Sequence, residues 1–560
     1  MKRVKFLSTV FSIALLSLTA CNNDDNKTTD EGQVSAVQAI EFKVDFADYN
    51  AEQEVGVTRA NKEVKLEQQM VDLGNGILAQ CSLQLDTTKQ TKSASTRALA
   101  NDTYTMLAYD AATHAYKGDI TGTVTGGVFT ATSANQDISL APGTYDFVLY
   151  NSKVTRSGNN LIVNRADADA ALIGRTQQVI TATPHKQKVP FTMKHVGAKV
   201  KIKLTGYMDI PAVTATLASV NATDVPGSSI YDASTGTWTA GTGAAMSANT
   251  TFNASSELYF FSNTFTSKSN EETMFMPATD VSKLKLTFNS GNIYLVNMAN
   301  AGLTFKPAST LKLEQNGAYV LNVKLMYNYL YLMSDGTTGF INETTYGGGT
   351  KTPIAVVVSQ SQRLAIALKD AGNGGAYIWQ QHPLAVSNVH IQFNLSDALN
   401  SDITSGKDET WNANYSTNNF TGSKVKAENP LFPAFNVAAA YNPGVPLTGA
   451  NLSKWFLPSA MDWWYAFRGL GFTTTKPLAA HSGPYYWYGA LATIAFTQVG
   501  GTTINGADFT AGGNRFYWTS SEYYYDDAFA IRTYNKQYSY GGNYNDFKYR
   551  YYHVRSFITY

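Results

Sequence analysis

Phe516-Tyr517-Trp518-Thr519-Ser520-Ser521-Glu522-Tyr523 is the stretch that decides how the C-terminal part of this chain folds. Two further aromatic blocks accompany it, Trp455–Ser459 upstream and Tyr552–Phe557 downstream. The density of aromatic residues is far above ordinary usage, and tyrosine dominates it. Tyrosine has a large apolar ring and a polar tip, which suits both cores and binding surfaces. We therefore expect the Trp and Phe residues in a core and most of the Tyr residues at its rim.

The upstream block predicts the start of a helix. Ser459 can accept a hydrogen bond in the first turn, and Asp462 completes a capping-box arrangement. The aromatic residues that share one helical face are Trp463, Trp464 and Phe467. Gly469 and Gly471 are expected to end the helix. Because such a helix must bury its rings, we expect it to pack across a sheet. The strands of that sheet would be Phe516–Ser520, Ala528–Ile531 and Tyr552–Phe557.

The segments before this helix are less regular. Pro353–Val358 is a short apolar, β-branched run and is predicted to be a buried strand. Arg363–Gly372 contains good helix formers and a closing glycine, so it can be either a helix or a further strand. Ser396–Pro446 is rich in Asn, Asp, Thr and Ser, and long loops are expected there.

The segment from Glu522 to Arg550 has the composition of a binding loop. Tyrosine rings, amides and cationic side chains offer stacking and hydrogen bonds to a sugar ring or a protein surface. The candidate ligand-binding residues are Tyr523, Tyr524, Tyr525, Arg532, Tyr534, Tyr538, Tyr540 and Tyr544. Alternatively, the tyrosines form a self-packed hairpin without a ligand. If they bind, replacing Tyr524 and Tyr540 by Ala should weaken binding and barely change folding.

The composition of the whole chain restricts its function. At 560 residues the chain is too long for one core, and its length suggests roughly three or four domains. Charged residues make up 15% of the sequence, against about 25% in an average protein. The formal net charge of +1 provides no basic surface for a nucleic acid, so we expect no nucleic-acid partner. Cys21 and Cys81 form no disulfide framework, and Cys81 is expected to be a small buried residue.

The N-terminal residues have the pattern of an export signal. Met1–Lys5 carries positive charge, and the apolar run Phe6–Leu18 is too short to span a bilayer comfortably. The end of the run, Leu18-Thr19-Ala20-Cys21, resembles a bacterial lipobox. The resemblance implies a signal peptide at residues 1–21, lipidation with palmitate at Cys21, and anchoring to the cell outer membrane. Residues 22–38 are polar and acidic and are expected to form a flexible tether.

From Ala39 to Asn328 the sequence has the pattern of β-structure. The first strand is predicted from residues that alternate with polar ones, namely Ile40, Phe42, Val44 and Phe46. Further strands are predicted at Val64–Gln68, Ile77–Leu85, Tyr104–Tyr109 and Tyr145–Tyr150. No long stretch here carries helical periodicity, so the region is expected to form packed antiparallel sheets, or two such sandwiches in series.

Three phrases in this region resemble the fimbrillin-like family of Bacteroidetes pilus proteins. They are the residues from Ala141 to Ser152, from Phe191 to Val200 and from Asn316 to Leu325. The resemblance covers about residues 35 to 328. It implies transthyretin-like β-sandwich domains at 39–195 and 196–328, and other pilin subunits as partners. His195 has no nucleophile or carboxylate constellation near it in sequence, so we expect a structural strand histidine rather than a catalytic one.

Arg59 and Arg97 lie in stretches that we expect to be exposed loops. The family resemblance implies trimming by an arginine-specific protease, after which a strand from the next subunit fills the groove left by the first strand. Main-chain hydrogen bonds and pockets for alternate side chains favour such strand addition. A cut after Arg59 removes the strand at 40–46, whereas a cut after Arg97 removes two more strands, so Arg59 is the preferred site. If neither is cut, the protein remains a lipid-anchored monomer.

The three aromatic blocks resemble the Legionella collagen-like adhesin C-terminal family and related modules of Bacteroidetes and Fibrobacter surface proteins. The resemblance covers about residues 335 to 560 and implies a C-type-lectin-like α+β fold. The calcium-ligand pairs of such lectins and the paired cysteines of formylglycine-generating enzymes are absent from this sequence, so we expect no metal, cofactor or catalytic site. Asp526, Asp527 and Asp546 could be paired carboxylates, but acids in loops are usually solvated or structural.

These patterns predict a mainly β protein, and the two family resemblances imply that it is a cell-surface fimbrial (pilus) subunit and not an enzyme. It would be exported as a lipoprotein, polymerise by strand addition, and bind a host or microbial glycan or protein. The last strand is expected inside the sheet of the C-terminal module, so the subunit can receive a strand but not readily donate one, which predicts a tip adhesin. The alternative is a lipid-anchored surface protein that binds glycans or proteins without polymerising. A weaker alternative is a surface enzyme acting on polysaccharide.

Overall fold

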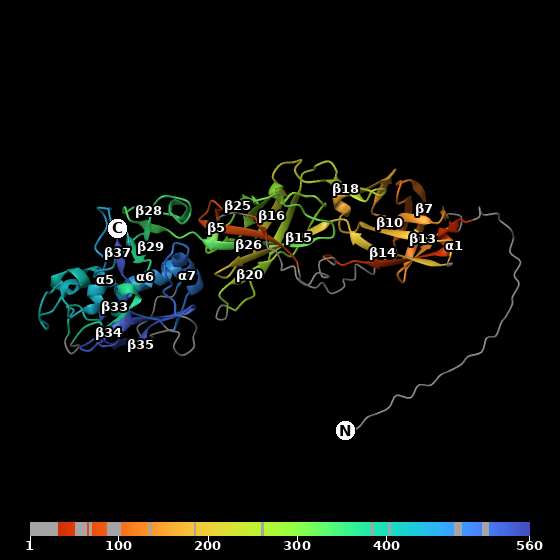
Figure 1. Ribbon diagram of the computed structural model, residues 1–560. Coiled ribbons are helices and arrows are strands. Elements are labelled where there is room, and N and C mark those ends of the chain that lie inside the picture. Colours follow the sequence, from red (N-terminus) through yellow and green to blue (C-terminus); the bar gives the residue numbers. More distant parts are fainter. Residues whose placement is uncertain are drawn as a thin grey trace, which may run out of the picture. The chain divides into compact units, whose positions relative to one another are not determined.

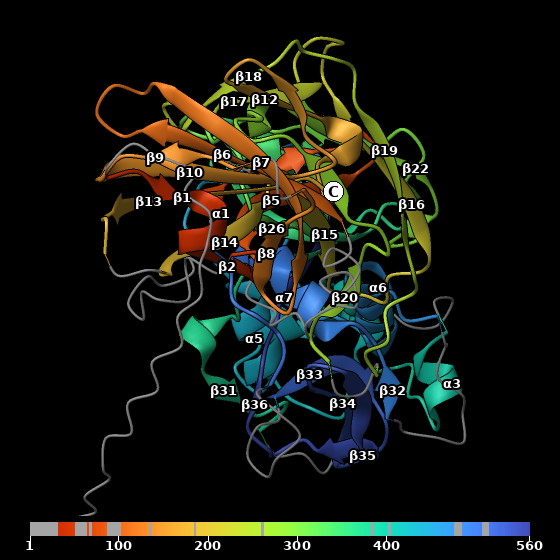
Figure 2. The ribbon, with the colours of Figure 1, turned by 90° about the vertical axis from the view of Figure 1, so that its right-hand side faces the viewer.

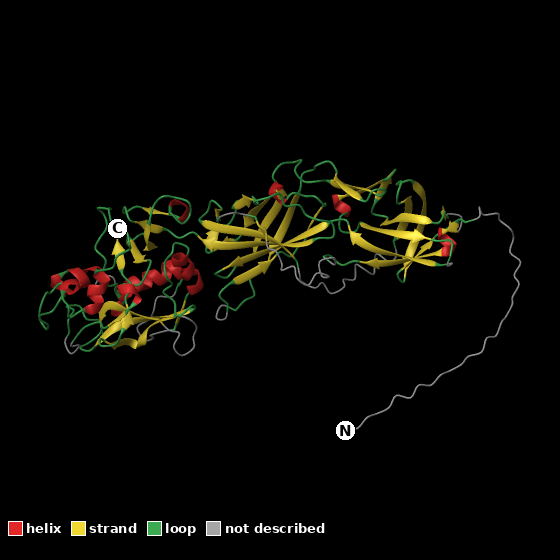
Figure 3. Cartoon of the chain, in the orientation of Figure 1, coloured by secondary structure: helices red, strands yellow, loops and turns green. Residues whose placement is uncertain are grey.

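The computed structural model describes residues 32–50, 64–66, 70–86, 102–133, 137–183, 186–258, 262–381, 386–400, 405–474, 484–506 and 515–560. Cys21, Arg59 and Arg97 lie outside these residues, as does the predicted signal peptide. The chain is mainly β, which confirms the predicted class (Figure 3). Within the described ranges, no helix is both long and apolar enough to cross a bilayer.

The chain separates into two compact units. The described residues of unit 1 fall within Met1–Asp45, Arg97–Tyr150 and Gly174–Thr192, and those of unit 2 within Phe46–Thr96, Asn151–Ile173 and Met193–Tyr560. The units are therefore discontinuous in sequence. Strand β2 (Ile40–Phe46) lies in unit 1 up to Asp45, whereas Phe46 and the residues that follow it belong to unit 2.

Unit 1 is built around a closed β-barrel (Figure 1). In their order around the barrel, the strands are β10 (Gly143–Asn151), β13 (Leu172–Ile180), β14 (Gln187–His195), β2 (Ile40–Phe46), β8 (Val128–Ala131), β7 (Tyr116–Thr125) and β6 (Thr103–Asp110). The alternation in β2 buries Ile40, Phe42 and Val44 and leaves Asp45 exposed. The strands close into a barrel instead of remaining two facing sheets, because β2 pairs with β14 on one side and with β8 on the other.

The chain is anchored before it reaches β2. Strand β1 (Val34–Ser35) pairs with β9 (Ser139–Leu140), and α1 (Ala36–Ala39) makes a single helical turn. Ser35 Oγ accepts a hydrogen bond from the Gln38 backbone N–H at 3.1 Å. The Asp137 carboxylate accepts one from the backbone N–H of Val37 at 2.8 Å.

Two sheets of unit 2 share one hydrophobic core. The seven-stranded sheet contains β20 (Phe265–Lys268), β15 (Ala198–Gly206), β26 (Ala318–Tyr327), β5 (Ile77–Leu85), β3 (Val64–Lys65), β21 (Thr273–Phe275) and β4 (Val71–Asp72). The four-stranded sheet contains β19 (Ser247–Phe252), β16 (Val213–Ser219), β22 (Leu284–Ser290) and β25 (Gly302–Thr304). Leu204 and Val323 of the first sheet and Leu217 and Leu286 of the second all belong to this core. The strands are mostly antiparallel, as predicted, but β15 and β26 run parallel.

Smaller sheets complete this part of unit 2. One contains β11 (Thr155–Ser157), β12 (Asn160–Asn164), β17 (Ser228–Asp232) and β18 (Thr237–Ala240). The other is the pair β23 (Asn292–Ile293) and β24 (Val296–Asn297).

Strand β5 lies in the seven-stranded sheet and not in the barrel. It pairs antiparallel with β26 from Ile77 opposite Tyr327 to Leu85 opposite Tyr319. Cys81 is buried in this strand, as predicted. The sequence placed these residues in a first domain covering 39–195. That continuous boundary does not hold for β5, because its alternating apolar side chains belong to the core that the seven-stranded and four-stranded sheets of unit 2 share.

Residues 329–560, called here the C-terminal module, combine two sheets with several helices (Figure 3). The five-stranded sheet contains β28 (Thr338–Gly339), β27 (Tyr331–Met333), β29 (Pro353–Ser359), β30 (Leu364–Ala367) and β37 (Phe557–Thr559). The six-stranded sheet contains β31 (Ala376–Tyr377), β36 (Tyr552–His553), β33 (Arg515–Glu522), β34 (Asp527–Thr533), β35 (Gln537–Phe547) and β32 (Tyr485–Tyr486). Figure 2 shows β33, β34 and β35 as neighbouring strands. The helices are α3 (Leu395–Ala398), α4 (Gly406–Trp411), α5 (Pro433–Ala439), α6 (Ala460–Gly471) and α7 (Gly489–Thr497).

Helix α6 confirms the helix predicted from the sequence. Ser459 and Asp462 form the predicted capping box. The helix contacts β29 of one sheet and β33 and β34 of the other. The Trp463 ring centroid lies 5.1 Å from that of Tyr517 in β33 and 5.5 Å from that of Phe557 in β37. The aromatic face thus joins the two sheets, as its sequence pattern predicted.

The end of α6 agrees with the prediction at Gly471 but not at Gly469. The helix continues through Gly469, its last residue is Gly471, and it is capped by Phe472, which is in the left-handed region with φ of 55°. A Cβ on Gly469 would lie 2.2 Å from the carbonyl oxygen of Val358. Glycine at this position therefore serves the close approach of α6 to β29 rather than the end of the helix.

The remaining predictions for the module have mixed outcomes. Pro353–Val358 is a strand, as predicted, and the Arg363–Gly372 segment, which could have been a helix, contains β30. Ser396–Pro446 contains irregular segments, as predicted, but it also holds the short helices α4 and α5. Helix α7 was not predicted, because it is apolar on all sides and has no polar cap.

The last strand is part of the module's own sheet. Strand β37 pairs with β30, and its other side forms a backbone bridge in which Phe456 and Phe557 exchange two N–H···O hydrogen bonds of 3.0 Å. Phe557 and Ile558 are fully buried. Residues 557–559 are therefore held by backbone hydrogen bonds and do not form an extended arm.

Candidate functional site

Phe42 is the central side chain of strand β2. Its ring centroid lies 6.2 Å from that of Phe129, 5.6 Å from that of Phe147 and 6.1 Å from that of Phe191. These rings come from β8, β10 and β14, so β2 completes a core to which three other strands contribute. Loss of β2 would expose this cluster to water, which is unfavourable unless another apolar strand replaces it.

The residues directly after β2 are fixed on unit 2 by backbone and amide hydrogen bonds. The Ala47 N–H donates to the Met193 carbonyl at 2.9 Å. The Asn50 N–H donates to the Asn316 carbonyl at 2.9 Å, and the Asn316 side chain donates to the Asp48 carbonyl at 2.9 Å. These reciprocal bonds hold the chain in one path. Arg59 follows this segment in the sequence, outside the described residues.

Tyr49 and His195 form a second anchor of the same segment. Their rings are stacked, with centroids 4.4 Å apart and planes at 10°. The Tyr49 hydroxyl donates to the Asp169 carboxylate at 2.8 Å, and His195 Nδ1 lies 2.5 Å from the Asp169 backbone carbonyl, to which it must donate. Burial lowers the pKa of His195 and raises the pKa of Tyr49. These contacts agree with a structural histidine, as expected from the sequence.

Tyr538, Tyr540 and Tyr534 are buried, which corrects the binding role predicted for them. Tyr538 and Tyr540 are 0% exposed, and Tyr534 is 6% exposed. The Tyr538 ring stacks on Phe467 of α6, with centroids 3.7 Å apart and planes at 13°. The inner face of β35 packs on the aromatic helix, so Tyr538 and Tyr540 belong to the core and do not present their rings to a ligand at the surface. The side chain of Tyr544 lies outside the described residues.

Five aromatic side chains of the same region are exposed, and we call them the aromatic patch. They are Tyr524, Tyr525, Phe547, Tyr549 and Tyr551, which are 44%, 49%, 38%, 54% and 71% exposed. The sequence predicted the first two and missed the others. Phe547-Lys548-Tyr549-Arg550-Tyr551, in which aromatic and cationic residues alternate, is the signal that could have identified them.

Four of the five rings of the patch form two pairs. Tyr524 and Tyr525 meet edge to face at 4.3 Å, and Phe547 and Tyr549 stack at 5.2 Å. The segments are joined because the Lys548 N–H donates to the Asp526 carbonyl at 2.8 Å. The patch therefore offers flat and edge-on rings at one end of a sheet, the kind of surface that binds sugars or proteins.

The other two candidates lie beside the patch. Tyr523 is partly buried and lies edge-on to Phe529 at 5.8 Å. The guanidinium of Arg532 lies over the rings of Phe516 and Tyr534, at 5.5 Å and 4.9 Å from their centroids. The guanidinium of Arg532 therefore already contacts aromatic rings of its own module.

A buried ion pair supports the patch from below. Glu522 and Lys548 are both 0% exposed and are paired with each other. The Lys548 ammonium also donates to the Tyr525 carbonyl at 2.8 Å, and the Glu522 carboxylate accepts the Ser387 N–H at 2.9 Å. Burial raises the pKa of Glu522 and lowers the pKa of Lys548. The pair thus fixes the turn that presents Tyr524 and Tyr525.

The acidic residues near the patch have structural contacts. Asp546 forms an ion pair with Arg550 at 2.7 Å and accepts a hydrogen bond from Tyr552. The Asp526 carbonyl accepts from the Lys548 N–H. Across the part of the chain that the structure describes, no three His, Cys, Asp or Glu residues are grouped to hold a metal ion.

The comparisons with known proteins concern the β-rich part of the chain. Residues 170–338, which contain the strands from β13 to β27, match the family model described as fimbrillin-like. No curated protein matches the chain.

Several solved structures are similar at low identity. A Bacteroides uniformis protein provisionally described as a cell adhesion protein is 17% identical, with 47% of this chain and 93% of that chain covered and a TM-score of 0.28. A fimbrial assembly protein from Parabacteroides distasonis is 10% identical, with 50% and 100% covered and a TM-score of 0.25. A fimbrial protein from Bacteroides vulgatus is 14% identical, with 51% and 95% covered and a TM-score of 0.25.

Proposed function

We propose that this protein is a cell-surface fimbrial subunit that assembles by strand addition after an arginine-specific cut at Arg59. The observation that carries the proposal is the position of β2 in the barrel. It contributes Ile40, Phe42 and Val44 to the core, and it is joined to the rest of the chain through the segment that contains Arg59. The fimbrillin-like match at residues 170–338 supports the same reading.

A cut after Arg59 would separate β2 covalently from the rest of the barrel. The edges of β14 and β8 would then flank a groove lined by Phe129, Phe147 and Phe191. An apolar strand from a neighbouring subunit fits such a groove, since it restores both the main-chain hydrogen bonds and the core. We propose that export as a lipoprotein and lipidation at Cys21 bring the precursor to the outer membrane.

We further propose that the protein occupies the tip of the fimbrium and acts as an adhesin. Strand β37 is paired inside the C-terminal module, so the described part of the module offers no strand for a next subunit. The aromatic patch would bind a host or microbial glycan or protein, in a module of C-type-lectin-like type. We assign no catalytic step to this site.

Proteolysis tests the proposal. Folded protein is incubated with an arginine-specific protease, and the new N-terminus is sequenced. A cut at Arg59, abolished in Arg59→Ala and retained in Arg97→Ala, is expected. Fimbriae from producing cells are then labelled with antibody against residues 340–560, and labels at the ends are expected. Absence of any cut at Arg59 or Arg97 would contradict assembly by strand addition after cleavage. Labels along the shaft would contradict the tip position.

The second candidate is a lipid-anchored surface protein that binds without polymerising. The closed barrel favours it, because β2 already occupies its place in the same chain. In that case the wild-type protein and Arg59→Ala would bind a glycan array equally and remain monomeric after protease treatment. Release of cleavage products from a bound polysaccharide would instead indicate an enzyme.

A further inference from the structure

The barrel of unit 1 is not closed evenly along β2. On the side that faces β8, strand β2 is paired at a single position, Lys43 opposite Val128. Next to this pair, the Val44 N–H donates a hydrogen bond of 2.8 Å to the Gly127 carbonyl. Toward the start of β2, Ile40 and Glu41 have no registered partner on β8 among the described residues. The two strands therefore diverge at this end.

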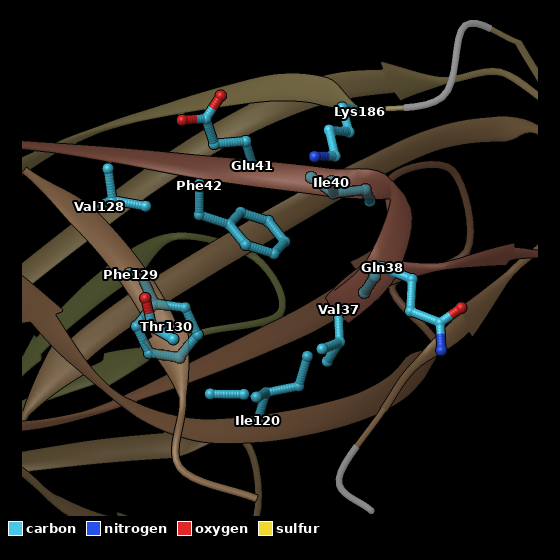
Figure 4. Close-up of a pocket in the computed structure, with 12 residues that line it drawn as sticks. Val37, Gln38, Ile40, Glu41, Phe42, Ile120, Val128, Phe129, Thr130 and Lys186 are labelled. Carbon is cyan, nitrogen blue, oxygen red and sulfur yellow. The ribbon is translucent and has the colours of Figure 1, made fainter. Parts of the chain in front are cut away.

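A cavity of about 460 Å³ lies where the strands diverge (Figure 4). Its apolar wall is formed by Val37, Ile40, Phe42, Ile120, Val128 and Phe129. The charged residues that line it are Glu41 and Lys186. The volume falls within the range of roughly 300–1,000 Å³ that is typical of specific ligand sites.

Strand β8 gives this cavity a backbone edge. On its other side β8 pairs with β7, from Gly122 opposite Ala131 to Thr125 opposite Val128. On the side toward β2, Thr130 and Ala131 have no registered partner in the described part of unit 1. An extended peptide matches this arrangement, because it supplies hydrogen bonds to the edge and an apolar side chain to the cavity. A small apolar molecule would leave the edge unmatched.

We propose that a strand of a neighbouring subunit first inserts at this opening, while β2 is still in place. The incoming strand pairs with Thr130 and Ala131 and places one apolar side chain in the cavity. It then displaces β2 progressively from Ile40 toward Phe46. This inference rests on the proposed function, and it adds the site and the order of the exchange. The route keeps Phe42 covered until a new side chain replaces it, so the barrel core is never fully exposed to water.

A nicked protein makes the test independent of natural cleavage. A recognition sequence for a specific protease replaces residues 58–60 in the full-length chain, which is then cut there. The probe is a fluorescein-labelled peptide with the sequence of residues 38–48, which stands in for the partner's strand. Fluorescence anisotropy follows its incorporation over time at a series of peptide concentrations.

Insertion before displacement has two expected signatures. The rate of incorporation rises in proportion to peptide concentration. Ala131→Trp fills the cavity and slows incorporation about tenfold, the effect of losing roughly one buried side chain's contribution to binding. Thr125→Trp is the matched control, since Thr125 is exposed on β7 outside the cavity, and it should leave the rate unchanged. The concentration series on unsubstituted nicked protein tests the proposal even if Ala131→Trp does not fold.

Three results would overturn the inference. A rate that is independent of peptide concentration would mean that β2 leaves first. An absence of incorporation would mean that no strand enters at all. Binding of dodecanoate that leaves the incorporation rate unchanged would assign the cavity to a small apolar ligand. By contrast, failure of an arginine-specific protease to cut the natural chain would count only against the proposed function.

Discussion

The ring of Tyr49 lies flat on the imidazole of His195, with centroids 4.4 Å apart and planes at 10°. Asp169 fixes both rings, through its carboxylate to Tyr49 and through its backbone carbonyl to His195. This contact fixes the path of the chain just after β2. Release of β2 with its following segment would therefore also uncover His195.

Acidification should weaken this anchor. The folded pKa of His195 is lowered from its ordinary value of 6.5, mainly by burial and also by the positive charge of Lys199, whereas Asp169 and Asp48 act in the opposite direction. Below about pH 6.5 the unfolded chain binds more protons than the folded chain, so stability falls with decreasing pH and levels off below the folded pKa. His195→Phe keeps a ring and cannot be protonated. The melting temperature of His195→Phe minus that of wild type should therefore increase as the pH falls from 8 to 5.

Melting temperatures of both proteins across this range check the prediction. Comparison with His195→Phe removes the contributions of other titrating groups, since these are common to both chains. Parallel curves for the two proteins would show that His195 does not titrate on unfolding in this range.

The burial of Tyr540 contradicts the surface position predicted from the sequence, whereas the exposure of Tyr524 agrees with it. Tyr540 is 0% exposed, and its hydroxyl lies 3.4 Å from the Ala460 carbonyl. Tyr540→Ala should destabilise the module by about 3–5 kcal/mol, the usual cost of removing a buried ring. Tyr524→Ala should change stability by about 0.5 kcal/mol or less. Chemical denaturation measures both, and equal stabilities would mean that β35 is not packed on α6.

The sequence predicts a structural feature correctly where the residues that determine the feature lie close together in the chain. The start of α6 is set by Ser459 and Asp462, three positions apart, and the prediction was correct. The partner of β5 is not a local property, since Cys81 lies opposite Val323 across a long stretch of chain. The two faces of the tyrosine-rich strand could not be separated either, because a register shift between β34 and β35 interrupts the period-two pattern.

The buried pair of Glu522 and Lys548 should be essential to the turn that carries Tyr524 and Tyr525. Lys548→Met leaves the Glu522 carboxylate buried without its cation, which should cost about 3–5 kcal/mol. The double variant with Glu522→Gln should recover part of this loss, because no charge then remains buried. Denaturation curves of wild type, the single variant and the double variant form the test. A single variant as stable as wild type would show that the pair does not support the turn.

Arg555 should tolerate no substitution, even by lysine. The guanidinium is 0% exposed, and its nitrogens donate to Ala367 O, Leu368 O, Thr502 O, Thr502 Oγ1 and Asp370 Oδ1 at 2.7–3.1 Å. Lysine has fewer donors and a different shape, so Arg555→Lys leaves buried carbonyls unsatisfied and should cost about 3 kcal/mol or more. Arg550, which is exposed and pairs with Asp546, is the matched control. Arg550→Gln should cost about 1 kcal/mol or less by the same denaturation measurement.

Phe42 should determine how firmly β2 is held in the barrel. Phe42→Ala removes a ring that contacts Phe129, Phe147 and Phe191 and should destabilise unit 1 by about 3–5 kcal/mol. Asp45→Ala lies on the exposed side of the same strand and is the matched control, with an expected change of about 0.5 kcal/mol or less. Hydrogen exchange of the barrel strands, followed by mass spectrometry, should show faster exchange in β8 and β14 for Phe42→Ala alone. Unchanged exchange in Phe42→Ala would mean that β2 contributes little to the barrel, and the groove left by its removal would then offer little to an incoming strand.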